Sequence, residues 1–334
     1  MEFMLKLDIP KASKLINHHQ KILSVGSCFT EHIGNALSSL KFEVLQNPNG
    51  ILFDPASVSS SLTSYIRNDQ YAGDDIFQLG EIWNSWRHHS RFSNTNKETV
   101  IQNINSSQTQ AHNFLREADW LIITLGSSFS YRLKDGELGK ESLINGGVAN
   151  CHRAPAQWFQ KHMLTIDETV AHLDNVIHQL FRFNINLNII FTISPVRHIR
   201  DGVVENNRSK ARLLESVHHL VNKFDKLFYF PSYELVIDIL RDYRFYSEDM
   251  VHPNYLATDY VLEQFIQAFM SDETNEIIKE IRKLNIARKH RSAHPHSKAH
   301  ENFLMSNLQK VKSLKEQYPF IDLEEELSYF STIR

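Results

Sequence analysis

Five short apolar runs alternate with longer amphipathic stretches along the 334-residue chain. The apolar runs are too short for helices, and several are rich in β-branched residues, so they predict strands. These strands are expected at residues 22–25, 42–45, 120–125, 187–193 and 227–230. Apolar positions at helical spacing predict helices at residues 29–40, 55–67, 97–117, 165–182, 208–226 and 254–270. Strands that alternate with helices indicate an α/β fold, with a mainly parallel sheet and helices on both faces.

Two regions depart from this alternation. Residues 75–92 are rich in aromatic side chains and predict a β-hairpin that turns at Leu79-Gly80-Glu81. Beyond residue 270 the chain becomes polar and helical, with an interruption at 287–300 and a last helical stretch at 303–330. Apolar residues recur in this tail at helical spacing, which favours one-sided burial. We therefore expect one catalytic domain at 1–270 and a helical extension at 271–334 that packs on it.

The first predicted strand ends in the turn Gly26-Ser27-Cys28, and a helix follows directly. Glycine permits backbone angles that other residues resist. Free N–H groups at a helix N-terminus favour negative charge, which would help a thiolate at Cys28 or an oxyanion on a substrate. Cys28 is thus a candidate nucleophile, and Ser27 is its rival. From the turn alone, a small inert residue that only packs there is the better explanation of the pattern.

A carboxylate and an imidazole stand three residues apart late in the chain, at Asp249 and His252. Pro253 follows and suits the first position of the next helix. This spacing lets the carboxylate accept the Nδ1 proton of the imidazole, so that Nε2 can face a nucleophile. The alternative is a helix-entry loop in which Asp249 only caps and His252 only packs.

Polar and glycine residues follow two other predicted strands, where the carboxyl ends of a parallel sheet place ligands. Gly126 and Ser127 end the third strand, and Asn47, Asn49 and Gly50 follow the second. Backbone N–H groups of the glycines, the serine hydroxyl and the two amides are candidate donors to an oxyanion. Ordinary turn formation explains the same residue types.

Several further side chains are candidates for substrate contact. Arg197 and His198 leave the fourth strand and could clamp an anionic or polar group. We expect His152, Tyr131 and Arg132 to contribute to the same pocket. The adjacent Cys151 is a weaker candidate nucleophile.

Composition narrows the functional classes. Lys and Arg number 36 against 39 Asp and Glu, and this balance gives no basic footprint for nucleic acid. Two cysteines do not make a disulfide framework, and no secretory leader or membrane-length apolar run is apparent. We therefore expect a cytoplasmic protein without a membrane partner. The histidine pairs lack the spacing of zinc sites, so no metal or other cofactor is expected.

These motifs together resemble the GSCFA family, which is named for its N-terminal motif. The chain has Gly-Ser-Cys-Phe-Thr at 26–30, with Thr in the last place. Further stretches that resemble the family lie at 47–55, 85–93, 124–132, 151–155, 194–198 and 230–254. GSCFA proteins are grouped with the SGNH, or GDSL-type, hydrolases, and the resemblance implies a flavodoxin-like sheet.

The GDSL pattern places its nucleophile on Cys28 and its final Asp-x-x-His on Asp249 and His252. Its second glycine falls near Gly50. In the third block Gly126 is present, but the usual Asn is replaced by serine. A cysteine in the nucleophile position is similar to some SGNH-like polysaccharide acetyltransferases.

The resemblance implies an esterase or acyltransferase that acts on a small acyl ester, with a carbohydrate as the expected carrier. Cys28 or Ser27, His252 and Asp249 would perform a covalent mechanism. The alternative, favoured by the missing Asn, is a carbohydrate-binding protein that kept the pocket without the chemistry.

Overall fold

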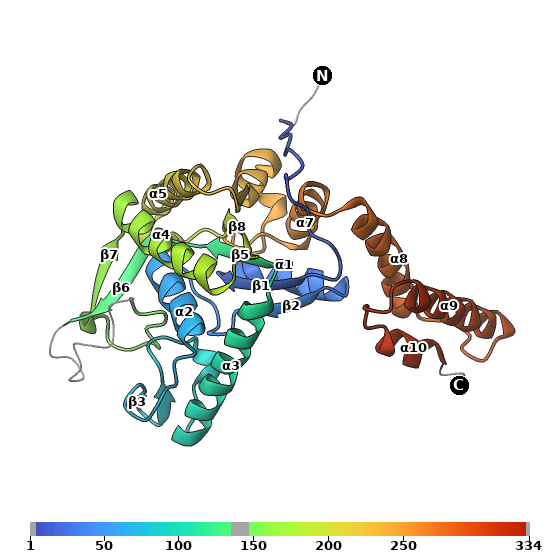
Figure 1. Cartoon of the computed structure of the whole chain (residues 1–334), viewed down its shortest axis with the longest axis horizontal. Coiled ribbons are helices and arrows are strands. Elements are labelled where there is room, and N and C mark those ends of the chain that lie inside the picture. Colours follow the sequence, from blue (N-terminus) through green and yellow to red (C-terminus); the bar gives the residue numbers. More distant parts are fainter. Residues whose placement is uncertain (1–4, 135–146, 332–334) are drawn as a thin grey trace.

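A computed structural model describes residues 5–134 and 147–331. A five-stranded parallel sheet with the order β2-β1-β5-β8-β9 forms its centre (Figure 1). The strands are β1 (Lys21–Gly26), β2 (Glu43–Gln46), β5 (Trp120–Leu125), β8 (Asn188–Ile193) and β9 (Leu227–Phe230). Counted along the chain, the sheet order is 2-1-3-4-5, which is the flavodoxin-like order. The expected fold class is therefore confirmed, and each predicted strand is present.

Two hydrophobic clusters cover the two faces of the sheet. On one face, α1 (Cys28–Ser39) and α7 (Tyr255–Phe269) pack against alternate strand residues such as Ile22, Ile122 and Ile190. The other face is covered by four helices: α2 (Pro55–Arg67), α3 (Lys97–Glu117), α4 (Ile166–Phe183) and α5 (Val203–Val221). The central strands β5 and β8 are buried throughout, as expected for strands covered on both faces.

Two antiparallel hairpins project from this core. The hairpin of β3 (Phe77–Leu79) and β4 (Ile82–Asn84) confirms the prediction for residues 75–92. A second hairpin, β6 (Phe129–Leu133) with β7 (Phe159–Met163), was not predicted. Its strands are short and are separated by 25 residues in sequence, so no local pattern indicates their pairing.

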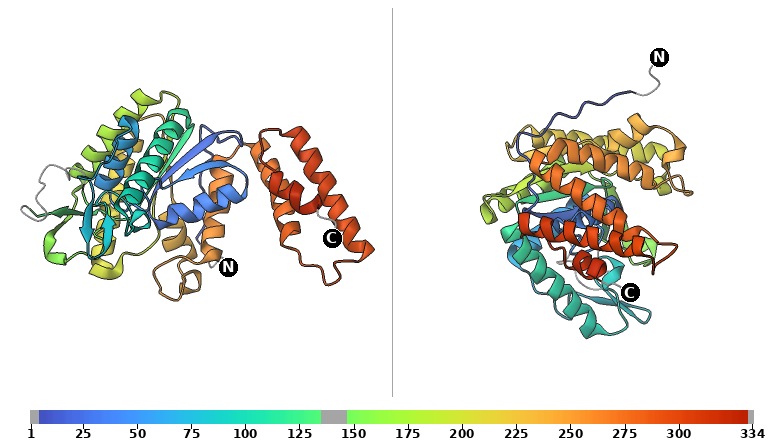
Figure 2. Two further views of the ribbon diagram at one scale, coloured as in Figure 1. Left: turned by 90° about the horizontal axis from the view of Figure 1, so that it is seen from below. Right: turned by 90° about the vertical axis from the view of Figure 1, so that its right-hand side faces the viewer.

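The C-terminal extension consists of α8 (Asp272–Lys289), α9 (Lys298–Gln317) and α10 (Glu324–Ser331), and it stands at one side of the sheet (Figure 2). The expectation of one helix at 303–330 was wrong. Pro319 lacks an N–H and its ring clashes with the preceding turn, so α9 ends just before it. No helix within residues 5–134 and 147–331 is long and apolar enough to cross a membrane.

Polar and apolar contacts join the extension to the α/β core. Lys41 Nζ lies 2.9 Å from the buried Glu326 Oε2, and Asn285 Nδ2 donates to the Ser39 carbonyl at 2.8 Å. Ile281 of α8 belongs to the same apolar cluster as Leu40 and Phe42. The extension is thus continuous with the core on the α1 face.

A matched pair of substitutions on α8 tests this packing. Ile281 is 1% exposed and Ile286 is 72% exposed. Ile281→Ala is expected to lower the free energy of unfolding by about 2–4 kcal/mol, because it leaves a cavity. Ile286→Ala should change it by less than about 0.5 kcal/mol. Urea denaturation of both variants measures the difference, and equal effects would contradict the packing.

Candidate functional site

The turn between β1 and α1 is tightly built. Gly26 has φ +140°, and a Cβ placed there would lie 2.1 Å from the carbonyl oxygen of Thr124 on β5. Ser27 caps α1, and its buried Oγ accepts a hydrogen bond from Phe29 N at 3.3 Å. Ser27 therefore has a structural partner, whereas Cys28 is partly exposed at the first position of α1.

Burial dominates the electrostatics of Cys28. It raises the pKa of the thiol, although the N–H groups of Cys28 and Phe29 and the charge of Lys210 act in the opposite direction. The expected depression of this pKa at the helix N-terminus is therefore wrong. The resting group is a thiol at neutral pH, and a base must remove its proton before it can act as a nucleophile.

Asp249 and His252 form the expected hydrogen-bonded pair. Asp249 Oδ2 lies 2.6 Å from His252 Nδ1, while Oδ1 accepts from the N–H groups of Val251 and His252 at 2.9 and 3.0 Å. These hydrogen bonds lower the pKa of Asp249 to about 2. The carboxylate therefore stays ionised and holds the imidazole by its Nδ1.

Contacts between loops bring the candidate residues to one edge of the sheet. Arg197 donates through its backbone N–H to Val251 O and through its guanidinium to Met250 O, both at 3.3 Å. A Cβ at Gly126 would lie 3.1 Å from His198 Nε2 and 3.3 Å from Ser27 Cβ. The turns after β1, β5 and β8 and the loop before α7 thus meet. No hydrogen bond among the described residues joins the Cys28 sulfur to His252.

Two expected oxyanion donors are already engaged. The N–H of Gly50 donates to Asn47 O at 2.7 Å, and the N–H of Gly126 donates to Phe53 O at 2.8 Å. These bonds close the turns in which the glycines lie. Neither N–H is free for a substrate, so this part of the prediction was wrong.

Of the polar side chains expected beside them, Asn47 keeps a free donor. Its Oδ1 accepts from Gly26 N at 2.9 Å, and its buried Nδ2 has no hydrogen-bond partner. Asn49 Nδ2 instead points to Arg87 O at 3.4 Å. Ser127 Oγ accepts from Phe129 N at 3.0 Å and contacts Ser209 Oγ. Of these three side chains, Asn47 is therefore the one whose donor has no hydrogen-bond partner among the described residues.

Lys210 on α5 is a site residue that the sequence did not single out. Its buried Nζ donates to the carbonyl oxygens of Gly126 and Ser194 at 2.6 Å each. Burial lowers its pKa to about 7, and its charge acts on Cys28 and His198. Lys210 thus joins the ends of β5 and β8. A lysine inside an amphipathic helix resembles an exposed charge, so no local pattern indicates that Lys210 is buried.

The lowered pKa of Lys210 predicts a dependence of protein stability on pH that Lys210→Met should lack. Between pH 7 and the ordinary lysine pKa of 10.5, the unfolded chain holds a proton that the folded chain has released. Stability of the native protein therefore rises with pH in that window. Between pH 7 and pH 9, we expect the free energy of unfolding of wild type to rise by about 2 kcal/mol more than that of Lys210→Met.

Urea denaturation at both pH values measures this gain. Lys226→Met is the control, because Lys226 is only half-buried and its Nζ reaches a single carbonyl. A difference between wild type and Lys210→Met that does not depend on pH would contradict the assignment.

A cavity of about 800 Å³ opens beside this edge. Four of the five expected substrate-contacting residues line it, namely Tyr131, His152, Arg197 and His198. Arg132 does not line the cavity, because its side chain is exposed and neighbouring strand residues point to opposite faces. The hairpin β6–β7, which the sequence did not predict, supplies much of the cavity wall.

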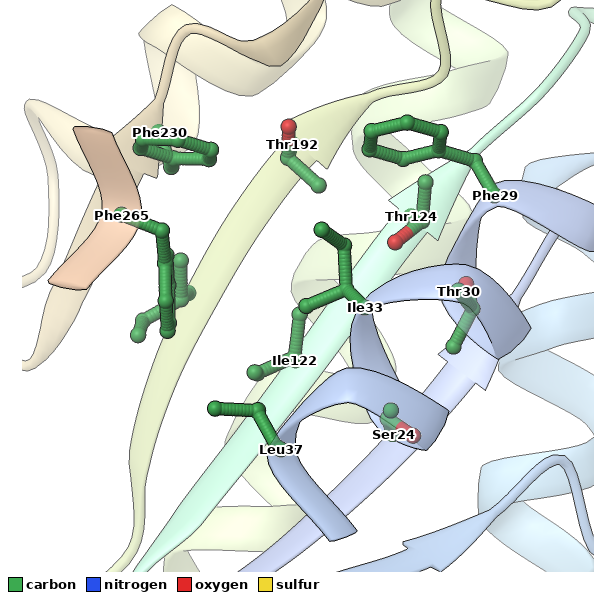
Figure 3. A pocket seen from close by; sticks show the side chains of 12 residues that line it. Ser24, Phe29, Thr30, Ile33, Leu37, Ile122, Thr124, Thr192, Phe230 and Phe265 are labelled. Atoms are coloured by element: carbon green, nitrogen blue, oxygen red, sulfur yellow. The ribbon is translucent and has the colours of Figure 1, made fainter. Parts of the chain in front are cut away.

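A second, much smaller void lies between α1 and the sheet (Figure 3). Its volume is about 20 Å³, and Phe29, Ile33, Ile122 and Phe265 line it together with a few hydroxyl-bearing residues. Such a space admits about one water molecule. It is a packing void and not a substrate pocket. Within the described ranges, no group of three His, Cys, Asp or Glu side chains is placed to hold a metal ion.

The fold defines an α/β protein with a flavodoxin-like sheet whose polar loops gather at the carboxyl edge. The GSCFA family model matches residues 21–265, and the model described as "GSCFA domain protein, C-terminal domain" matches residues 281–332. The chain therefore belongs to the GSCFA family, as its motifs indicate. Among solved structures, it is similar to a Clostridium thermocellum family 3 carbohydrate esterase. The identity is 13% and the TM-score 0.32, over 78% of this chain and 97% of the other. No curated protein sequence matches the chain.

Proposed function

We propose that this protein is an SGNH-like esterase or acyltransferase that transfers a small acyl group through Cys28. The observation that carries the proposal is the hydrogen bond between Asp249 and His252, on a loop tied to the edge that holds the Cys28 turn. An ionised carboxylate that orients an imidazole is the arrangement that activates a nucleophile in hydrolases. A small acyl ester of a carbohydrate is the proposed substrate.

The raised pKa of Cys28 sets the order of the steps. His252 Nε2 removes the thiol proton as Sγ attacks the ester carbonyl. The tetrahedral intermediate then collapses, and the alcohol leaves with the proton held by His252. Water or a sugar hydroxyl next attacks the thioester while His252 again takes a proton. Release of the acid or the new ester restores the thiol.

Two donors are available to the oxyanion. The N–H of Cys28 lies at the start of α1, and Asn47 Nδ2 is buried and without a partner. Donors fixed by the fold before the reaction need little reorganisation, which is why such groups stabilise developing charge well. Asn47 would thus take the role of the Asn that the third motif block lacks.

A second candidate function is carbohydrate binding without catalysis. It is favoured by the engaged N–H groups of Gly50 and Gly126 and by the protonated resting state of Cys28. A protein that only binds would keep the cavity but would not turn over an ester.

A substrate screen separates the two functions. Short-chain 4-nitrophenyl esters and acyl thioesters are offered to wild type and to Cys28→Ala, with sugar acceptors present or absent. The proposal expects turnover by wild type alone, and faster release of nitrophenol with an acceptor would indicate transfer. Equal rates for wild type and Cys28→Ala would contradict turnover through Cys28 and favour carbohydrate binding without catalysis.

A further inference from the structure

Cationic side chains are concentrated in the lining of the 800 Å³ cavity. Arg153, Arg197 and Arg200 line it, and none of them forms an ion pair with a described carboxylate. Arg197 lies over the ring of Tyr246 at 4.1 Å, which holds its guanidinium in place. Arginine forks suit planar oxyanions, to which they can donate two parallel hydrogen bonds.

The acidic residues of the cavity do not cancel this charge. Asp201 pairs with Lys161, so these two residues neutralise each other. Asp54 is buried, and its Oδ1 accepts from the N–H groups of Ala56 and Ser57 at the start of α2. Burial raises the pKa of Cys151 to about 11, so its thiol adds no negative charge. Among the described residues that line it, the cavity therefore keeps an excess of positive charge from its arginines.

The rest of the wall is aromatic. Phe53, Phe129, Tyr131 and Phe159 line the cavity, and its volume lies within the range of small-molecule sites. Aromatic faces beside charged donors suit a pyranose ring that carries an anionic substituent. His198 and Ser127 also line the cavity, and a Cβ placed at the neighbouring Gly126 would lie 3.3 Å from Ser27 Cβ. The cavity therefore opens beside the nucleophile turn, although Cys28 and His252 are not themselves among its lining residues.

We propose that this cavity binds an anionic sugar residue, a pyranose that bears a carboxylate or a phosphate, and presents its acyl ester to Cys28. The inference rests on the proposed function for the ester chemistry, whereas the charge preference rests on the cavity alone. Arg153 and Arg200 are the specificity-determining residues.

Binding measured without turnover tests the preference. Isothermal titration of the full chain uses galacturonate, galactose 6-phosphate and galactose, so the two anionic sources are compared with a neutral sugar. We expect at least one anionic sugar to bind about tenfold or more tightly than galactose, because charge-assisted hydrogen bonds are stronger than neutral ones. The preference should decline at high salt.

Substitutions locate the effect. Arg153→Ala and Arg200→Ala should each reduce the preference several-fold, and the double variant should reduce it to the small part that Arg197 supplies. Both residues are exposed, so folding is not at risk. Arg132→Ala removes a charge from the β6–β7 hairpin outside the cavity and should leave the preference for anionic sugars unchanged. Equal affinity for galactose and both anionic sugars, or an undiminished preference in the double variant, would overturn the inference.

Activity data keep the two proposals separate. Charge-selective binding without any ester turnover by wild type would refute only the proposed function. Turnover that depends on Cys28 without charge selectivity would refute only this inference.

Discussion

Cys28→Ala is expected to lose ester turnover by about 10⁴-fold or more, because it removes the atom that forms the covalent intermediate. Cys28→Ser should also lose most activity, since a hydroxyl ionises far less readily than a thiol. Steady-state rates on the best ester from the substrate screen measure both effects. The melting temperature of each variant shows that the fold is kept.

Ser27→Ala is the matched control in the same turn. Ser27 is buried and caps α1, so its loss should cost about 1 kcal/mol of stability and leave turnover within a few-fold of wild type. If Ser27→Ala were inactive and Cys28→Ala active, the nucleophile would be Ser27.

Gly26→Ala is expected to have the largest effect on stability. A Cβ at this position would lie 2.1 Å from Thr124 O, and φ is +140°. The obstacle is backbone in the adjacent central strand, so no flexible side chain can move aside. Relief requires β1 and β5 to separate where the site is built. We expect a loss of more than about 3 kcal/mol in the free energy of unfolding, or no soluble protein.

Gly80→Ala separates the clash from the effect of backbone angle. Gly80 has φ +62° at the tip of the β3–β4 hairpin, and a Cβ there would meet nothing within 4 Å. Only the cost of a left-handed angle remains, about 1 kcal/mol. Chemical denaturation compares the two variants. Similar losses at both positions would contradict the tight approach of β1 to β5.

The sheet could be predicted from sequence because its signals are local. The run at 120–125 is apolar in every place, and the helix at 97–117 has its cap at Asn96, so both bounds agree with the structure. The β6–β7 hairpin depends on pairing between segments far apart in the chain, for which alternation gives no evidence. The break between α9 and α10 was missed even though Pro319 marks it.

At the candidate site, too, local features could be predicted from the sequence and long-range contacts could not. The Asp249–His252 hydrogen bond spans three residues, so its spacing could be interpreted directly. The N–H groups of Gly126 and Gly50, which were expected to be free donors, donate to Phe53 O and Asn47 O, and a sequence does not show which carbonyl lies opposite. Burial of Cys28 and Lys210 depends on packing around the edge of the sheet. The sequence therefore indicates residue types at the site but not the state of their protons.

Trapping the acyl intermediate is the most direct test of covalent catalysis through Cys28. Wild type is mixed with 4-nitrophenyl acetate, quenched in acid within the first turnover, digested and examined by mass spectrometry. We expect one acetyl group on Cys28 in wild type, slower acetylation in His252→Ala and none at this position in Cys28→Ala. Acetyl on Ser27 or Cys151 with Cys28 unmodified, or labelling of Cys28 at the same rate without His252, would contradict it.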